Sequence, residues 1–335
     1  MPLWLVLALA YIFEFANGWT DAPNSIATVV STRVMRPLQA VLMAGLLNLV
    51  GAFAGTAVAE TIAEGIVDPR FVTLETIAAA VLGATVWAMG AQYFGLPSSE
   101  SHALIAGLLG AGFAAGGLDG LLSEGPRAAL VGLFTSPIGG FLIALLIMVA
   151  IYWIFRRTRP SLVRRIFGRG QVFSAAFMAF SHGANDAQKT MGIITLALVL
   201  DEAGTGAGVP SEFDIPLWVI LSAGLVMGIG TMVGGWRVIR TIGLRLTKLE
   251  PVHGFAAETG AAAVIFGAAR FGIPVSTTHA IGSAIMGVGA TERLSAVRWG
   301  VAGQVVSAWV LTWPSCALLG YALEKLFSAL FGGGG

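Results

Sequence analysis

The residues best suited to chemistry in this sequence form two polar motifs that interrupt apolar stretches. The first runs from Asn17 to Ser25 and the second from Ser181 to Thr190, and they carry Asp21 and Asp186 at matching places. An acid within a membrane-spanning stretch is costly, so it usually pairs, takes up a proton or binds an ion. We therefore expect a cation site at Asp21, Asn185 and Asp186, with sodium as a candidate ion at the two aspartates. The alternative is that these acids only cap helix ends.

A second pair of motifs places hydroxyl side chains directly after a proline. The two sequences are Pro97-Ser98-Ser99-Glu100-Ser101-His102 and Pro274-Val275-Ser276-Thr277-Thr278-His279. Each should begin a helix, whose free amide groups and dipole favour an anion. Hydroxyl donors beside these amides would form a cradle for an oxyanion, and the alternative is a pair of plain Ser/Thr caps. The substrate contacts expected in the two cradles are Ser99, Ser101, Ser276, Thr277 and Thr278.

Other titratable residues also occur in matched pairs. His102 and His279 share one position of the hydroxyl motifs, where a histidine can carry a proton, orient a substrate or simply pack against neighbours. Glu75 and Glu258 each precede an alanine run at matched places. Both glutamates are candidates for completing the cation sites or for pairing with Lys189. The alternative is that they lie at the membrane interface near a helix start.

The elements that must position these residues are membrane-spanning helices. Of the 335 residues, 56% are hydrophobic and 11% are charged, whereas soluble domains carry about a quarter charged residues. A helix needs roughly 20 apolar residues to cross the hydrocarbon core. Five stretches are mostly apolar over about that length, namely 38–59, 77–94, 128–155, 216–236 and 299–323. The composition excludes a soluble protein, and an outer-membrane barrel would need short segments of alternating polarity instead.

Enzyme signatures are missing from the sequence. It contains no ATP-binding loop, no metal-spaced set of Cys and His residues and no nucleophile elbow. We therefore expect neither enzymatic activity nor a cofactor, and we expect the energy for any transport to come from an ion gradient.

The motif pairs recur in the same order, which indicates an internal duplication. Residues 15–25 align with 180–190, and residues 95–103 align with 272–280. The two halves are predicted at residues 1–155 and 171–331.

A basic linker at residues 156–170 joins these halves. It contains six arginines, and the positive-inside rule places such a segment in the cytoplasm. Beside a membrane these charges indicate topology, so no nucleic-acid partner is expected. If Arg33 and Arg36 are also inside and the acidic segment 60–68 is outside, each half makes an odd number of crossings. The second half is then inverted, as in many secondary transporters.

The motifs also predict where helices are interrupted. Pro23 removes an amide donor, so two half-helices are expected to meet at the first polar motif, and the same is expected at the second. The segments 97–116 and 274–289 are either full crossings or re-entrant hairpins. The predicted fold is an all-α polytopic membrane protein with two inverted-topology repeats, broken or re-entrant helices and about ten hydrophobic segments.

The two polar motifs, together with Gly272-Ile273-Pro274-Val275-Ser276-Thr277-Thr278-His279, resemble the duplicated signatures of the inorganic phosphate transporter (PiT) family. The resemblance covers nearly the whole chain. It implies uptake of inorganic phosphate by symport with sodium or protons in the inner (plasma) membrane, and a homodimer. It assigns the cation to Asp21, Asn185 and Asp186. It assigns the anion to Ser99, Ser101, Thr277 and Thr278, with Asn24, Ser25 and Thr190.

Two positions depart from the usual family pattern. The first motif has Trp19-Thr20 before Asp21 where an Ala-Asn pair is usual, and Glu100 adds a charge to a row of hydroxyls. Phosphate can donate a hydrogen bond at neutral pH whereas sulfate cannot, so Glu100 could favour phosphate by accepting its proton. A sulfate permease of the same fold is the main alternative function. An anion channel is a further alternative, against which the paired intramembrane acids argue.

Overall fold

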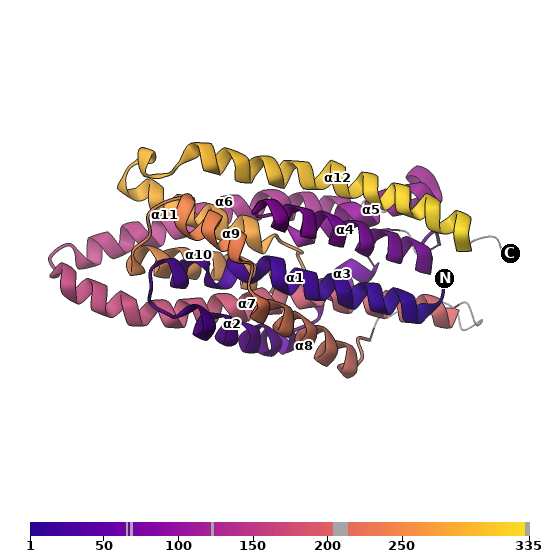
Figure 1. Cartoon of the computed structure of the whole chain (residues 1–335), viewed down its shortest axis with the longest axis horizontal. Coiled ribbons are helices and arrows are strands. Elements are labelled where there is room, and N and C mark those ends of the chain that lie inside the picture. Colours follow the sequence, from indigo (N-terminus) through magenta and orange to yellow (C-terminus); the bar gives the residue numbers. More distant parts are fainter. Residues whose placement is uncertain (65, 68–69, 122–123, 204–213, 332–335) are drawn as a thin grey trace.

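The protein is a bundle of helices (Figure 1). Its computed structural model describes residues 1–64, 66–67, 70–121, 124–203 and 214–331. Within these ranges the only strand-like feature is an isolated bridge between Val67 and Leu121. The first half contains α1 (Leu3–Ser31), α2 (Pro37–Gly51), α3 (Ala57–Glu64), α4 (Leu74–Phe94), α5 (Glu100–Gly116) and α6 (Glu124–Phe155). The second half contains α7 (Pro160–Glu202), α8 (Leu217–Val233), α9 (Trp236–Arg240), α10 (Pro251–Arg270), α11 (Thr277–Glu292) and α12 (Trp299–Phe331).

Seven of the described helices are long and apolar enough to cross a membrane, and an eighth span is formed if α8 and the bent segment after it count as one. This criterion leaves out α7, whose apolar residues are interrupted by the second polar motif, and α11, which has only 16 residues. With these two helices the described chain has about ten hydrophobic segments. The prediction of an all-α polytopic membrane protein is therefore confirmed.

The two halves pack against each other reciprocally. Helix α12 of the second half contacts α4 and α5, and α6 of the first half contacts α10 and α11. In the same way α1 packs on α8, while α7 packs on α2. Figure 1 shows both chain termini at one end of the bundle and the connection between α6 and α7 at the other. The halves thus run in opposite directions, and the predicted inverted repeat is confirmed, while the exact boundaries at 155 and 171 stay a prediction.

The α4–α5 and α10–α11 pairs are hairpins that enter the bundle from opposite ends (Figure 1). Helix α4 ends at Gly95, which adopts a left-handed φ of 68° that glycine tolerates. The chain then turns back into α5. The hydroxyl of Ser101, at the tip of this hairpin, donates to the carbonyl oxygen of Val275 at the other tip, at 2.9 Å. Each hairpin returns to the end that it came from, so the sequence alternative of re-entrant hairpins is the one observed.

The predicted break in the two polar motifs is wrong. Helix α1 runs without interruption through Pro23, and α7 is continuous over its 43 residues. A proline is tolerated in a membrane helix when neighbouring groups compensate for the lost hydrogen bond. The broken helix lies elsewhere, between α8 and the segment 236–245, where the chain bends by 59° beside Gly234.

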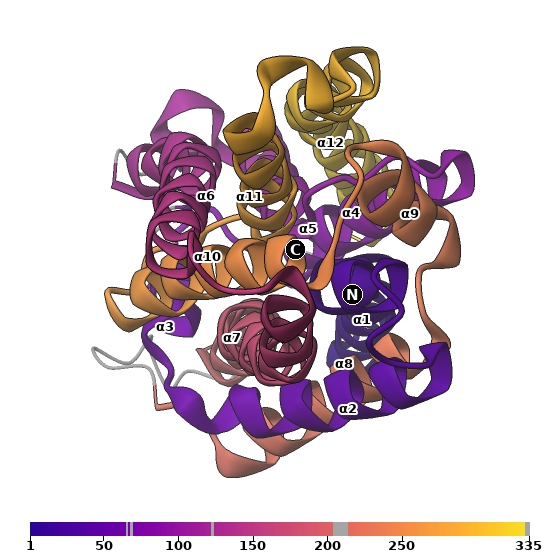
Figure 2. The same ribbon diagram turned by 90° about the vertical axis from the view of Figure 1, so that its left-hand side faces the viewer.

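The outer surface of the bundle is apolar and charged side chains are buried inside it, unlike in a soluble protein. Large apolar side chains such as Phe134 and Leu318 are 61% and 68% exposed on the outer surface. Asp21, Asp186 and Lys189 are buried. In the end-on view of Figure 2, α1 and α7 lie side by side within the ring of other helices. These two helices position the charged residues away from lipid.

The packing of α5 against α12 depends on glycine. A Cβ atom at Gly110 would lie 1.9 Å from the backbone oxygen of Ala317, whereas one at Gly90 in α4 would meet nothing within 4 Å. We expect Gly110→Ala to destabilise the protein by about 1–3 kcal/mol through overpacking. Gly90→Ala should be neutral or stabilising by up to about 1 kcal/mol, because alanine favours a helix. Thermal unfolding in detergent tests both, and equal stability of the two variants would contradict the close contact.

Candidate functional site

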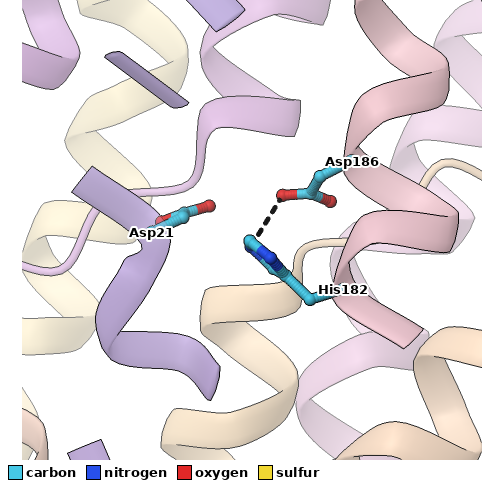
Figure 3. A group of neighbouring side chains, drawn as sticks. All are labelled: Asp21, His182 and Asp186. Carbon is cyan, nitrogen blue, oxygen red and sulfur yellow. Dashed lines mark ion pairs between the residues drawn. The ribbon is translucent and has the colours of Figure 1, made fainter. Parts of the chain in front are cut away.

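The four sequence motifs meet in one buried cluster at the centre of the bundle. Helices α1 and α7 each contribute a polar motif, and the hairpin tips bring in the first turns of α5 and α11. Figure 3 shows Asp21 on α1 pointing toward His182 and Asp186 on α7. The sequence therefore identified the correct segments, and their side chains can be followed in detail.

The carboxylate of Asp21 is held by neutral groups. Its Oδ1 accepts from the hydroxyl of Thr278 at 3.0 Å, and its Oδ2 accepts a long bond from Thr277 at 3.5 Å. The amide nitrogen of Asn24, one turn along α1, donates to the same two hydroxyls at 2.9 and 3.1 Å. One hairpin tip thus serves both the aspartate and the asparagine of the first motif.

The carboxylate of Asp186 has a charged partner. Its Oδ1 lies 2.8 Å from the ammonium group of Lys189 and accepts from the amide of Asn185 at 2.6 Å. Its Oδ2 accepts from Thr277 at 3.2 Å. Lys189 also donates to the hydroxyl of Ser101 at 2.6 Å, so it links α7 to the first hairpin tip. All of these side chains are buried.

The ring of His182 lies between Asn48 and Asp186. The amide nitrogen of Asn48 donates to Thr231 at 2.7 Å, so the Asn48 oxygen, 3.1 Å from Nδ1 of His182, accepts from that ring nitrogen. This contact places the Nδ1 proton toward Asn48. Nε2 lies 3.3 Å from Oδ2 of Asp186, which is an ion pair when both ring nitrogens are protonated and a contact that a cation could join when Nε2 is not.

Asp21, His182 and Asp186 together could hold a cation. One ligand atom from each lies within 4.8 Å of the others, and in the described chain they form the single such group of acidic, His and Cys residues. The fit is chemical as well as geometric, because carboxylate oxygens and a neutral imidazole nitrogen are common cation ligands. A bound cation would supply the positive counter-charge that the buried carboxylate of Asp21 lacks.

Several oxygen atoms around this cluster are also buried without a hydrogen-bond partner. They are Oδ1 of Asn24, Oγ of Ser25, Oδ1 of Asn185 and Oε2 of Glu100. The other carboxylate oxygen of Glu100 accepts from Thr20 at 2.7 Å and from Ser98 at 3.4 Å. Unpartnered buried polar atoms are rare and usually indicate water, an ion or a ligand. Their concentration here fits a site for a small polar ligand.

Ser99 and Ser276 act as helix caps in the structure. The hydroxyl of Ser99 accepts from the backbone amide of His102 at 3.3 Å, and that of Ser276 accepts from the amide of His279 at 3.1 Å. These bonds begin α5 and α11 and so fix the direction of the following hydroxyls. The capping role that the sequence left open is therefore the one seen for both serines.

Three further predicted contacts do not join the central cluster. Glu75 pairs with the amino group of Met1 at the end of the bundle. Glu258 accepts hydrogen bonds from Thr28, Ser174 and Gln171 between α1, α7 and α10. Thr190 donates to Glu14 on α1. The sequence could not locate these partners, because all of them come from distant segments of the chain.

The two matched histidines face away from the aspartates. The rings of His102 and His279 are 4.6 Å apart, and His279 stacks on Trp309 at 4.1 Å. Their ring nitrogens have no hydrogen-bond partner. Each follows its capping serine by three residues, about one helical turn, which directs the ring toward α12 rather than toward the hairpin tip. Packing is the role that the structure displays.

Glu14 is a buried acid that the site prediction missed. The hydroxyl of Thr190 and the amide of Asn17, at 3.3 Å, donate to its Oε2. Its side chain is buried between α1 and α7, one to two turns before Asp21 on α1. The signal was present, since an acid within an apolar stretch is itself unusual.

An inverted repeat with two re-entrant tips and a buried charged site defines the protein as a secondary transporter. Residues 17–320 match the phosphate transporter family, and the chain belongs to that family. It is therefore a transporter rather than an enzyme.

Curated relatives and a solved structure are similar over nearly the whole chain. A probable low-affinity inorganic phosphate transporter of Rhizobium meliloti (strain 1021) is 47% identical over 94% of this chain and 93% of its own. One of Bacillus subtilis (strain 168) is 41% identical over 98% and 97%. The solved structure of a sodium-dependent phosphate transporter has a TM-score of 0.90 and 26% identity, and covers 98% of this chain and 99% of that chain.

The Asp186–Lys189 contact makes a stability prediction. We expect Asp186→Asn to destabilise the protein by about 3–5 kcal/mol, because it leaves the buried ammonium of Lys189 without its counter-charge. The double variant Asp186→Asn/Lys189→Asn should recover most of that loss, since it removes both charges. Thermal unfolding of the purified proteins compares the stability of both variants with that of the wild type. A double variant no more stable than Asp186→Asn would argue against direct pairing.

Proposed function

We propose that the protein takes up inorganic phosphate across the plasma membrane in symport with a cation, either sodium or protons. The observation that carries this proposal is the convergence of both hairpin tips and both motif aspartates in one buried cluster. Membership of the phosphate transporter family supports the substrate, and the sodium-dependent structural neighbour supports a coupling cation. The arginines around the α6–α7 connection support a cytoplasmic place for that end of the bundle.

In this proposal the cation binds first to the Asp21 carboxylate, with His182 and Asp186 as further ligands. The hydroxyl of Thr278 donates to Asp21, and that of Thr277 lies within reach of both aspartates. A cation on that carboxylate competes for the same oxygens and turns the hydroxyls toward a phosphate oxygen. Each ligand thereby favours the other, which is the coupling that symport requires.

The phosphate would occupy the space between the hairpin tips. Ser101, Thr277 and Thr278 supply hydroxyl donors, Asn24 supplies an amide, and Lys189 supplies a positive charge. The first amide groups of α5 and α11 add the favourable potential of a helix N-terminus. Opening toward either side would follow from rocking of one half, about 1–155, against the other, about 171–331, across the linker at 156–170.

Uptake into proteoliposomes tests the proposal directly. Labelled phosphate is offered with a sodium gradient and a pH gradient imposed separately, and one of them should drive saturable accumulation. Counterflow of labelled against unlabelled phosphate should also occur, because a carrier exchanges its substrate whereas a channel shows only electrodiffusive flux. Absence of both gradient-driven uptake and counterflow would exclude the proposed symport.

Asp21→Asn should lower cation-driven uptake by roughly a hundredfold or more, because a buried charge contact is worth about 3–5 kcal/mol to its partner. Asp119→Asn is a matched control, since Asp119 is exposed in the turn after α5. Initial rates are measured at several cation concentrations. Unchanged cation dependence in Asp21→Asn would remove this residue from the site.

Glu100 is predicted to select phosphate over sulfate. Its unpartnered Oε2 can accept a hydrogen bond from the hydroxyl that phosphate carries at neutral pH and that sulfate lacks. Glu100→Gln should therefore reduce the preference for phosphate by about tenfold, the cost of a hydrogen bond to a charged group. Competition by sulfate against labelled phosphate uptake gives the ratio, with the exposed Glu60→Gln as control. An unchanged ratio would exclude this role for Glu100.

A further inference from the structure

At the centre of the site, the second half has the charged Lys189 where the first half has a neutral residue. The motif alignment pairs Asp21 with Asp186 and Asn24 with Lys189, three residues further along each helix. It also pairs Thr278 of one hairpin with Ser101 of the other. The residue at the third position is therefore neutral in the first half and charged in the second.

The contacts of these two residues are equivalent across the repeat. Asn24 donates to the hydroxyl of Thr278 at 2.9 Å, and Lys189 donates to that of Ser101 at 2.6 Å. Both side chains thus reach the same position of the hairpin from the opposite half. The ammonium nitrogen takes the place of the amide nitrogen, so the difference is one of charge and not of place.

Because of the charge on Lys189, the two aspartates differ in whether they have a positive partner on the chain. Asp21 receives hydrogen bonds from hydroxyls, which leave its negative charge uncompensated. Asp186 lies 2.8 Å from the ammonium of Lys189, and both are fully buried. Glu100, the additional acid near this tip, is bonded to Thr20 and Ser98 rather than to Lys189. One aspartate therefore requires an exchangeable cation, and the other already has a cation bound to the chain.

We propose that Lys189 is a tethered cation that permanently fills the second of two repeat-related cation positions. The transporter consequently moves one cation fewer per phosphate than a chain with asparagine at this place. An ammonium on a side chain stabilises the anion as a free cation does, but it cannot leave with the substrate. The inference rests on the proposed symport, whose coupling number it specifies.

The number of coupled cations is measured from equilibrium accumulation. Proteoliposomes with the membrane potential clamped at zero receive a tenfold gradient of the ion that drives wild-type uptake. Each coupled cation then contributes a factor of about ten to the final phosphate ratio. Lys189→Asn should accumulate about tenfold more phosphate at equilibrium than the wild type, even if its rate is lower. Lys189→Arg, which keeps the charge, and Lys325→Asn, at the far end of α12, should give the wild-type ratio.

An equal ratio for Lys189→Asn and the wild type would overturn the proposal. If Lys189→Asn folds but does not transport, calorimetric titration with the coupling cation decides, since one additional site per chain is expected and an unchanged number refutes it. If Lys189→Asn does not fold, the equally neutral Lys189→Gln replaces it. Lys189→Gln should also accumulate about tenfold more phosphate than the wild type, and the wild-type ratio refutes the proposal.

These outcomes separate the inference from the proposed function. If the wild type shows no gradient-driven uptake, the symport itself fails. The calorimetric count for Lys189→Asn needs no transport and still tests whether the lysine fills a cation position.

Discussion

Charge buried within a membrane-embedded bundle is the constraint on which this structure depends. Asp21, Asp186 and Lys189 lie inside a shell of apolar helices whose outer side chains face lipid. Removing such groups from water costs several kcal/mol per ion unless partners replace the solvent. Every partner seen here comes from the four motif segments, so the same segments that create the charge problem also solve it. In the proposed symport, the coupling cation balances the charge on Asp21.

The inverted repeat is the device that brings these partners together. A hairpin that enters from one end exposes the free amides and hydroxyls of its second helix at mid-depth, where lipid could not satisfy them. Here the tip of the other hairpin, which enters from the opposite end, covers it together with α1 and α7. The Ser101–Val275 hydrogen bond is this contact. Close glycine packing, as between Gly110 and Ala317, lets the hairpins and spanning helices approach without voids.

The two halves differ at several residues that can carry charge. Asn24 corresponds to Lys189, Thr277 to Glu100 and Asn17 to His182, whereas the two aspartates and the proline before each tip are the same. The shared residues build the cluster. The differing residues decide which charges are fixed to the chain, and in the proposed symport the transported ions supply the others.

The sequence by itself determined the membrane class, the duplication, the opposite orientation of the halves and the segments that form the site. These follow from hydropathy, charge distribution and repeated local order, all of which are properties of neighbouring residues. Tertiary structure alone decided that α1 continues through Pro23, that the hairpins are re-entrant and that His102 and His279 turn toward α12. It also decided the partners of Glu14, Glu75 and Glu258, and it placed Lys189 in contact with both Asp186 and Ser101. The reason is physical, because the free energy of a buried polar group is set by the atoms around it, and those atoms come from distant parts of the chain.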